Sequence, residues 1–332
     1  MRVGLTFERK SDFRPPPGAP PDASAEMEMD YTIDELGDAI RAAGHELVPL
    51  GSAARLLALG PSLRKEVDLV FNYSVGFGGR ARETWIPAIL DVAGVPFVGG
   101  DAICLGIASD KHATKALAAR LGIPTPDSVL VLDEADLASA AFPPFPLIVK
   151  PNLEGSSIGL TESSVVRDAV ALRARVRECL AIYRQPVLVE RFIAGAEATV
   201  CLLGDPLEPF GVVGVAIDGT GELGERFLHG ALKGHIERTA GLVPSGLPPA
   251  TEDALARHAT RLARALGARD FCRCDFRIST QGEPYLLEAN PIPQLQRIRG
   301  EFSLVAESRG GTFQDVVARI LASAITRAGL RA

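Results

Sequence analysis

The sequence predicts an α/β protein in which an N-terminal parallel sheet is followed by two units of mixed α+β character. In the first hundred residues, short apolar runs alternate with amphipathic helical segments, which is typical of a parallel sheet covered by helices. The remaining two thirds mix strands and long helices without this regular alternation. With 332 residues, the chain has room for two or three domains of ordinary size.

The elements expected in the first unit are strands at 2–7, 45–50, 68–74 and 96–98 and helices at 30–43, 80–93 and 101–108. A proline-rich segment at 14–23 predicts a loop. The second unit is expected to hold helices at 110–121 and 167–182 and strands at 128–132, 146–150 and 186–192. For the third unit we expect strands at 197–204 and 209–218, a helix at 251–266, a hairpin, and closing helices at 302–309 and 312–328.

The composition is that of a soluble globular protein, with 47% hydrophobic and 23% charged residues. A net charge of −6 argues against binding nucleic acid through a basic surface. No apolar stretch is long enough for a membrane span. The chain opens with a strand pattern and not with a signal peptide. Its five cysteines are odd in number and scattered on apolar faces, which predicts reduced core thiols in the cytoplasm.

Two segments near the C-terminus, Phe271–Ile278 and Pro284–Asn290, alternate with period 2 and predict a β-hairpin. A two-residue turn at Gln281-Gly282 would place Asp275 opposite Glu288. Two carboxylates facing each other repel, and a hard divalent cation such as Mg²⁺ removes the conflict. The alternative is a two-stranded hairpin without a metal site, in which the two carboxylates face each other by chance. The same register pairs Arg273 with Asn290, Arg277 with Leu286 and Ser279 with Pro284, and assigns to the core Cys272, Cys274, Phe276, Tyr285, Leu287 and Ala289.

An apolar strand ends at Lys150 and leads into a small loop that contains Glu154, Ser156 and Ser157. A flexible loop with hydroxyls and free backbone amides beside a lysine suits a polyphosphate, although no P-loop motif is present. A solvated lysine at a strand end explains Lys150 equally well on its own.

A second apolar strand ends at Glu190 and Phe192, and Glu197 follows. The backbone at such a hinge can bind adenine, and a nearby carboxylate can accept hydrogen bonds from ribose hydroxyls. Two ordinary surface carboxylates are the alternative. A competing motif, Gly76-x-Gly78 with Asp101 some twenty residues later, resembles a dinucleotide fingerprint, but it leaves the opposed carboxylates and Lys150 unexplained.

Taken in order, these segments resemble the ATP-grasp superfamily, in particular its D-alanine–D-alanine ligase branch. The resemblance spans nearly the whole chain. Its matching residues are Asp68–Asn72, Arg82-Glu83, Gly94–Gly99, Asp110-Lys111, Thr114-Lys115, Val149–Pro151, Glu154–Ser157, Val187–Glu190, Glu197, Arg273, Asp275 and Leu287–Asn290.

The resemblance implies an ATP-grasp fold with domains at 1–105, 106–193 and 194–332, the last two clamping ATP. It also implies an ATP-dependent carboxylate–amine ligase that works through an acyl phosphate and uses one or two Mg²⁺ ions. The implied nucleotide-binding residues are Lys111, Lys150, Glu154, Ser156, Ser157, Glu190, Phe192 and Glu197. Asp275, Glu288 and Asn290 would hold the metal. Arg273 would stabilise the oxyanion, and Lys233 would reach the γ-phosphate.

The substrate-binding motifs depart from the family pattern. The usual Gly-Gly-x-Ser-x-Glu is missing after the first strand, where Glu8 is the expected substitute for the carboxylate that binds the first substrate's ammonium. Arg299 stands where the family has a carboxylate-binding serine, and Arg297 is close by. Arginine offers a bidentate fork, so this pair predicts an acceptor with a free carboxylate, with solvated loop arginines as the alternative.

We therefore expect amino-acid-like substrates other than two D-alanines to be at least as plausible as D-alanine itself. Further expectations are a cytoplasmic homodimer and no nucleic-acid or membrane partner. A non-catalytic ATP-binding homologue is the main alternative, and the metal and arginine motifs argue against it. A nicotinamide-dependent oxidoreductase is the other.

Overall fold

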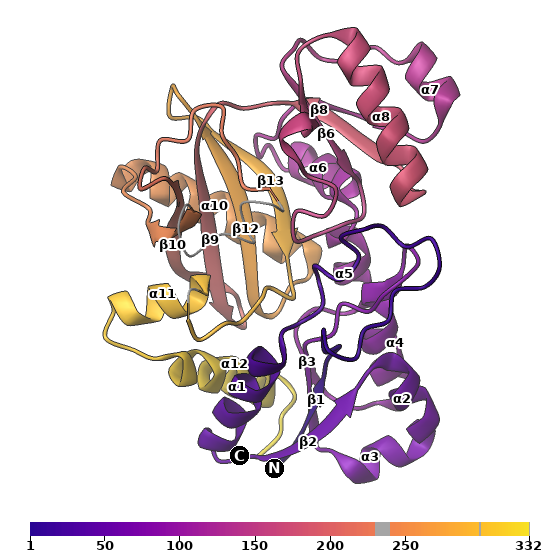
Figure 1. Cartoon of the computed structure of the whole chain (residues 1–332). Coiled ribbons are helices and arrows are strands. Elements are labelled where there is room, and N and C mark those ends of the chain that lie inside the picture. The colour runs from indigo at the N-terminus through magenta and orange to yellow at the C-terminus, as the bar shows by residue number, and fades with distance from the viewer. Residues whose placement is uncertain (230–239, 299, 332) are drawn as a thin grey trace.

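Three sheets, each formed by a different third of the chain, make up the framework of the molecule (Figure 1). The computed structural model describes residues 1–229, 240–298 and 300–331. The predicted mixed α/β class is confirmed, with one parallel and two antiparallel sheets.

The first unit is a parallel sheet in the order β2-β1-β3-β4. Its strands are β1 (Arg2–Thr6), β2 (Glu46–Gly51), β3 (Leu69–Asn72) and β4 (Phe97–Val98). Its helices are α1 (Asp30–Ala42), α2 (Ala53–Leu59), α3 (Leu63–Glu66), α4 (Trp85–Ala93) and α5 (Ala102–Ala108), with 3-10 turns η1 (Gly60–Ser62) and η2 (Arg82–Thr84). The sequence did not predict α2 and α3.

The second unit begins with α6 (Lys111–Arg120), whose first turn is capped by the side chain of Asp110. Its antiparallel sheet has the order β5-β8-β6-β7. The strands are β5 (Ser128–Val131), β6 (Leu147–Pro151), β7 (Val165–Val166) and β8 (Val187–Arg191). The helices are α7 (Glu134–Ser139) and α8 (Ala169–Tyr183), with the 3-10 turn η3 (Glu162–Ser164). The sequence missed α7 and β7.

The third unit is a five-stranded antiparallel sheet in the order β11-β10-β9-β12-β13. Its strands are β9 (Gly195–Gly204), β10 (Glu208–Ile217), β11 (Ala240–Pro244), β12 (Asp270–Ser279) and β13 (Pro284–Asn290). Its helices are α10 (Pro249–Leu266), α11 (Glu301–Ser308) and α12 (Phe313–Arg327). The sequence did not predict β11.

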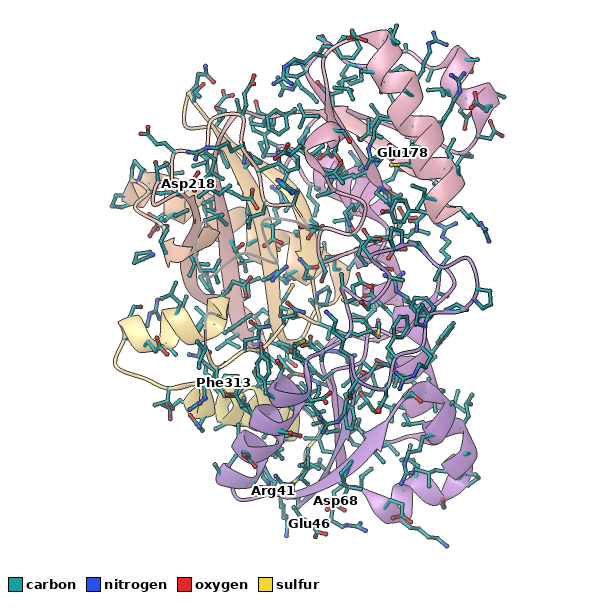
Figure 2. All side chains as sticks on the ribbon, viewed as in Figure 1. Arg41, Glu46, Asp68, Glu178, Asp218 and Phe313 are labelled. Carbon is teal, nitrogen blue, oxygen red and sulfur yellow. The ribbon has the colours of Figure 1, made fainter. Side chains whose placement is uncertain are left out.

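The closing helix α12 joins the third unit to the first, because it packs against α1 as well as against β9 and β12 (Figure 1). Phe313, labelled in Figure 2, is 3% exposed and belongs to a core cluster that also contains Leu36 and Ile40 of α1. At the other end of the helix, Arg327 bonds Asp270 at 2.6 Å and the carbonyl of Phe97 at 2.8 Å. One hydrophobic core therefore fixes the N-terminal sheet beside the C-terminal sheet.

The hairpin confirms one half of the predicted register and corrects the other. Asp275 lies opposite Glu288, and Arg273 lies opposite Asn290, as expected. Beyond Asp275 the register shifts by one, so Arg277 faces Tyr285 and not Leu286, and Ile278 and not Ser279 faces Pro284.

The register shift is a β-bulge at Leu287, and the expected two-residue turn is replaced by a longer connection closed between Ser279 and Glu283. The bulge reverses the faces predicted for its neighbours. Leu286 is fully buried in the core, whereas Leu287 and Tyr285 are not among the buried residues.

All five cysteines are buried and free, as the sequence predicted. Among the described residues, none of the helices combines the length and the apolar character that a membrane crossing requires.

Candidate functional site

A cleft of about 1070 Å³ lies where the three units meet. Each unit contributes polar side chains to its lining: Glu8 and Tyr73 come from the first, Lys150 and Glu190 from the second, and Asp275 and Glu288 from the third. Segments far apart in the sequence therefore surround one space, and all of these residues except Tyr73 were predicted from the sequence as site residues.

Asp275 and Glu288 face each other on the cleft side of the β12–β13 hairpin. Thr199 donates a hydrogen bond of 2.8 Å to Asp275, and the amide of Asn290 donates one of 3.1 Å to its other oxygen. Burial raises the pKa of Asp275 to about 7, and the neighbouring Glu288 carboxylate adds to this effect despite Arg273. A cation between the two carboxylates would remove that penalty.

The oxygen atoms available at this pair of carboxylates match the ligands that Mg²⁺ prefers. Carboxylate and amide oxygens are hard ligands of the kind magnesium prefers, and Asn290 completes the set on the same strand. The described residues contain no cluster of three His, Cys, Asp or Glu side chains that could hold a metal by themselves. The site thus suits an ion that takes its remaining ligands from phosphate and water, as Mg²⁺ usually does in proteins.

Lys111 is held at the edge of this carboxylate pair. It begins α6, and Asn152 fixes that helix end by donating to Asp110 at 2.8 Å and accepting from the amide of His112 at 2.9 Å. The Lys111 ammonium lies 3.2 Å from Glu288 and donates to the carbonyl of Glu154. Burial disfavours charge on Glu288 as well as on Lys111. The Lys111 and Lys150 ammoniums outweigh this effect and hold the pKa of Glu288 well below its usual range.

Lys150 and Glu190 form part of a buried triad with Lys115. Glu190 is 2% exposed and lies 2.6 Å from the Lys150 ammonium and 3.0 Å from that of Lys115. Burial opposes the charge on Glu190, but the two ammoniums hold its pKa below the ordinary value. Burial lowers the pKa of Lys115 to about 8. The triad has a net positive charge, and because Lys150 and Glu190 line the cleft, this charge lies beside a space that suits phosphate.

The loop after β6 contains two consecutive residues with left-handed backbone conformation. Ser156 and Ser157 both have positive φ, at 48° and 62°, and both line the cleft. Such values are uncommon for residues other than glycine and mark sites where the backbone is under functional constraint. The hydroxyls of the two serines, next to Lys150 in the cleft lining, are groups that can bind phosphate oxygens. Glu154 at the start of the loop pairs with Arg82 at 3.2 Å and accepts from Gln185 at 2.6 Å, so it anchors the loop.

Phe192, which directly follows β8, and Glu197, near the start of β9, both line the cleft. Phe192 packs edge-on against Phe227 with ring centres 5.9 Å apart. Glu197 lies 3.4 Å from the guanidinium of Arg277, which also covers the face of Phe192. An aromatic wall beside a strand-end carboxylate fits a purine nucleoside.

The first unit contributes four glutamates to the cleft lining, Glu83 and the three described next. Glu8 accepts from the hydroxyl of Ser74 at 2.6 Å and from the amide of Gly76 at 3.4 Å. Glu26 accepts from the amide of Gly155 at 2.6 Å and from Arg82 at 2.7 Å. Glu28 is buried, and its pKa is raised to about 7 because burial outweighs its hydrogen bonds to Gln294 and Tyr73.

Sequence reasoning missed Glu26 and Glu28. The Ser-x-Glu spacing of the family pattern does occur at Ser24-x-Glu26, but the proline-rich insertion carries it away from the first strand. The sequence selected Glu8, which the structure places in the same part of the cleft.

Arg273 lines the cleft and is held by two carboxylates. Its guanidinium bonds Glu301 of α11 at 2.7 Å and lies 3.4 Å from Asp275. Glu301 was not predicted from the sequence as a site residue. Arg297 is not part of the cleft lining; its side chain is 53% exposed and pairs with Glu35 at 2.9 Å. Lys233 and Arg299 lie outside the described residues.

The glycine motif that resembles a dinucleotide fingerprint does not form one. Gly76 and Gly78 have positive φ in a loop that leads into the short 3-10 turn η2 and not into a long helix. Asp101 accepts from the amide of Cys104 as the N-cap of α5. Both features serve the local structure of the first unit.

Comparison with known proteins identifies relatives along most of the chain. Residues 117–322 match the protein family described as D-ala D-ala ligase C-terminus. A D-alanine--D-alanine ligase of Stutzerimonas stutzeri is 35% identical over 288 residues, which cover 85% of both chains. One from Syntrophotalea carbinolica is 34% identical over 311 residues, covering 92% of this chain and 94% of the relative. An uncharacterized protein of Sinorhizobium fredii, y4sG, is 31% identical over 308 residues, 87% of this chain and 85% of the relative.

Solved structures share the fold along the full length. A D-alanine--D-alanine ligase from Bacillus anthracis, complexed with ATP, superposes with a TM-score of 0.73 at 20% identity and covers 99% of each chain. The VanG D-Ala:D-Ser ligase from Enterococcus faecalis superposes with a TM-score of 0.72, also at 20% identity, over 97% of this chain and 99% of its own. The ATP-grasp fold predicted from the sequence is thereby confirmed.

Proposed function

This chain belongs to the D-alanine–D-alanine ligase family, and we propose that it uses ATP to join the carboxylate of one amino acid to the amine of a second substrate. The chain is thus an ATP-dependent ligase that forms C–N bonds. The observation that carries this proposal is the meeting of Asp275, Glu288, Lys150 and Arg273 in one cleft, between an aromatic end and an end lined by glutamates.

The nucleotide would lie along the second unit. Phe192 and Glu197 offer an apolar wall and a carboxylate for adenine and ribose. Lys150, with Lys111 and the amides around Ser156 and Ser157, would bind the phosphates. These cations neutralise charge that develops on the transferred phosphoryl group, which is the main contribution a protein makes to such a transfer.

Asp275, Glu288 and Asn290 would hold one or two Mg²⁺ ions. The metal supplies charge neutralisation and orientation of the phosphates. Lys233 would add a further positive charge at the γ-phosphate, an expectation that rests on the family resemblance alone.

The donor carboxylate would lie near Arg273, with its ammonium against Glu26 or Glu8. Phosphorylation converts the poor carboxylate electrophile into an acyl phosphate, and the acceptor amine then attacks the carbonyl carbon. Arg273 would stabilise the negative oxygen of the tetrahedral intermediate. Because an acyl phosphate hydrolyses in water, water would have to be kept from the intermediate during the reaction.

Hydroxylamine trapping tests the first half of the reaction. With ATP, Mg²⁺ and a panel of D- and L-amino acids, we expect an ATP-dependent hydroxamate from at least one amino acid and stoichiometric phosphate. No hydroxamate with any donor would favour the non-catalytic homologue, in which the cleft binds ATP without turnover.

The names of the relatives favour D-alanine as one candidate for both substrates. We further propose a homodimer and a cytoplasmic location, the latter supported by five free, buried thiols. Domain limits at 1–105, 106–193 and 194–332 are supported by the separate sheets of the three segments.

A further inference from the structure

The proline-rich insertion, residues 9–28, is fixed to the rest of the first unit. Its two ends meet through the backbone, since the amide of Glu28 donates to the carbonyl of Glu8 at 3.2 Å. Within the insertion, the ring of Phe13 packs edge-on against Phe77 with ring centres 4.7 Å apart. Phe77 lies inside the glycine motif that forms no dinucleotide site, so this motif supports the insertion.

Two carboxylates of the insertion, Asp22 and Glu26, hold the two ends of the serine loop, residues 152–160. Glu26 accepts a hydrogen bond of 2.6 Å from the amide of Gly155, and Asp22 accepts one of 2.8 Å from the amide of Gly159. The two acceptors are four residues apart in the insertion, and the two donors are four residues apart in the loop. The insertion and the loop therefore meet at matched intervals, with the two serines of the loop between the held amides.

Both donors are glycines, and the packing at each leaves no room for a side chain. A Cβ atom on Gly155 would lie 2.5 Å from a carboxylate oxygen of Glu26, and one on Gly159 would lie 2.5 Å from Pro151. Gly159 also has a positive φ of 76°. A larger residue at Gly155 would push the carboxylate away, and one at Gly159 would distort the loop itself.

The Asp22 carboxylate has a second partner in the unit that carries the loop. The hydroxyl of Tyr183, the last residue of α8, donates to Asp22 at 3.1 Å. On the other side of the loop's end, the carbonyl of Gly159 accepts from the buried guanidinium of Arg175. Gly159 is therefore held through its amide and through its carbonyl, and Asp22 connects it to the first unit.

We propose that Asp22 is a positioning residue for ATP, because with Glu26 it makes the insertion a clasp that holds the serine loop in its phosphate-binding shape before the nucleotide enters. Asp22 is not among the residues that line the described part of the cleft, so it acts through the loop. A loop that is ordered in advance loses little conformational freedom when a ligand binds, which raises affinity. This inference rests on the ATP-dependent function proposed above.

Nucleotide binding by the full-length protein tests the clasp independently of the amino-acid substrates. The Kd is measured by isothermal titration calorimetry with Mg²⁺ and AMP-PNP, an ATP analogue with a nitrogen bridge between the β- and γ-phosphates that resists hydrolysis. We expect Asp22→Ala to raise this Kd about tenfold, because two hydrogen bonds to a carboxylate are lost. Asp12→Ala, a change at an exposed aspartate of the same insertion, is the matched control and should leave the Kd unaltered.

Conservative variants assign the effect to the two hydrogen bonds of Asp22. Asp22→Asn should restore most of the affinity, since its amide oxygen can accept from Gly159 and its NH₂ group can donate to the hydroxyl of Tyr183. Tyr183→Phe removes one bond and should raise the Kd about threefold. Added to Asp22→Ala, Tyr183→Phe should have no further effect, because the hydroxyl acts through Asp22.

Hydrogen–deuterium exchange distinguishes positioning of the loop from general stabilisation of the fold. Without nucleotide, the faster exchange of Asp22→Ala should be confined to peptides that cover the serine loop and the insertion, and AMP-PNP should suppress it.

An unchanged Kd in folded Asp22→Ala would overturn the inference and leave the nucleotide site intact. A lower melting temperature with an unchanged Kd would do the same, since Asp22 would then only stabilise the fold. If Asp22→Ala does not fold, Tyr183→Phe decides, and an unchanged Kd in that variant would refute the clasp. Absence of AMP-PNP binding by the wild type would instead remove the ATP-dependent function, and the inference with it.

Discussion

The backbone amide of Gly155 donates a hydrogen bond of 2.6 Å to the carboxylate of Glu26, although 129 residues separate them in the chain. The second oxygen of Glu26 bonds Arg82 at 2.7 Å, and Arg82 also donates to the carbonyl of Leu153 at 3.0 Å. One carboxylate of the first unit therefore fixes the loop that we assign to the phosphates of ATP.

Replacing Glu26 with glutamine should loosen this loop. The change keeps the shape but removes the charge that bonds Arg82, so we expect a rise of about tenfold in the KM for ATP from a loss of roughly 1–2 kcal/mol. Steady-state phosphate release measures the effect. Glu46→Gln on β2, at the lower end of the view in Figure 2, is the exposed control. Equal ATP KM values for the two variants would show that the contact does not position the loop.

Removing one of the opposed carboxylates should abolish turnover without unfolding the protein. Asp275→Asn resembles the protonated form that the raised pKa of Asp275 favours, so the melting temperature should stay the same or rise. ATP-dependent phosphate release should fall at least about a thousandfold, because the metal ligand is lost. Glu288→Gln should have the same effect on phosphate release and on the melting temperature.

Asp218→Asn, an exposed change in the same unit and labelled in Figure 2, provides the control for this pair. Near-normal phosphate release by Asp275→Asn or Glu288→Gln would refute the metal assignment.

The hairpin shows how far the sequence could predict this site. Alternation placed Asp275 opposite Glu288 correctly because both lie on the side of the bulge near the end of β13. The bulge itself has no signal in the sequence, since one unpaired residue and a longer turn change the alternation very little. The bulge nevertheless decides which side chain is buried, since Leu286 packs in the core and Leu287 lines the cleft.

The residues at the glutamate-lined end were harder to predict. Glu26 lies behind the proline-rich insertion, and Glu301 approaches Arg273 only through the placement of α11. A sequence records neither contact, because both depend on how separate units pack. Motifs within one strand and its following loop, such as Lys150 with Ser156, were predicted because their neighbours in space are also neighbours in sequence.

Preference for ATP or for NAD distinguishes the ligase hypothesis from the oxidoreductase hypothesis. ATP with Mg²⁺ should raise the melting temperature, since a ligand at 100 times its Kd adds about 2.7 kcal/mol to the stability of the state it binds. NAD at the same concentration should leave it unchanged. Differential scanning fluorimetry measures both. A clear shift with NAD and none with ATP would restore the glycine motif as a nucleotide site.

Stability should fall as pH rises through the range in which Glu28 ionises. Its pKa is about 7 in the folded protein and near 4.5 when exposed, so between these values only the unfolded state gains from ionisation. Each pH unit in that interval costs up to about 1.4 kcal/mol, and the loss ends above pH 7. Glu28 is buried, and Gln294 and Tyr73 are its side-chain hydrogen-bond partners.

Glu28→Gln should therefore lose less stability than the wild type between pH 5 and pH 8, measured as the change in melting temperature. Other carboxyls with raised pKa values, including Glu83 and Asp275, stay in the variant and contribute equally to both proteins. Identical pH profiles for the two proteins would mean that Glu28 is ionised in the folded state at every pH in this range.

The buried triad should be far more sensitive than a surface ion pair of similar length. Glu190→Gln leaves the ammoniums of Lys115 and Lys150 buried without a carboxylate, and breaking such a pair costs about 3–5 kcal/mol. Glu178→Gln on α8 removes a 2.7 Å contact with Arg175, but the Glu178 side chain is 52% exposed, so the cost should be below about 1 kcal/mol. Figure 2 labels Glu178 on the outer helix of the same unit. We expect Glu190→Gln to lower the melting temperature by several degrees and to raise the ATP KM. Burial already lowers the pKa of Lys115 to about 8 while Glu190 is present, and the loss of that carboxylate lowers it further. The variant should therefore regain part of its stability as the pH rises to 9, because the buried Lys115 is then neutral. Equal melting temperatures for the two variants at pH 7 would show that the two lysines do not depend on Glu190.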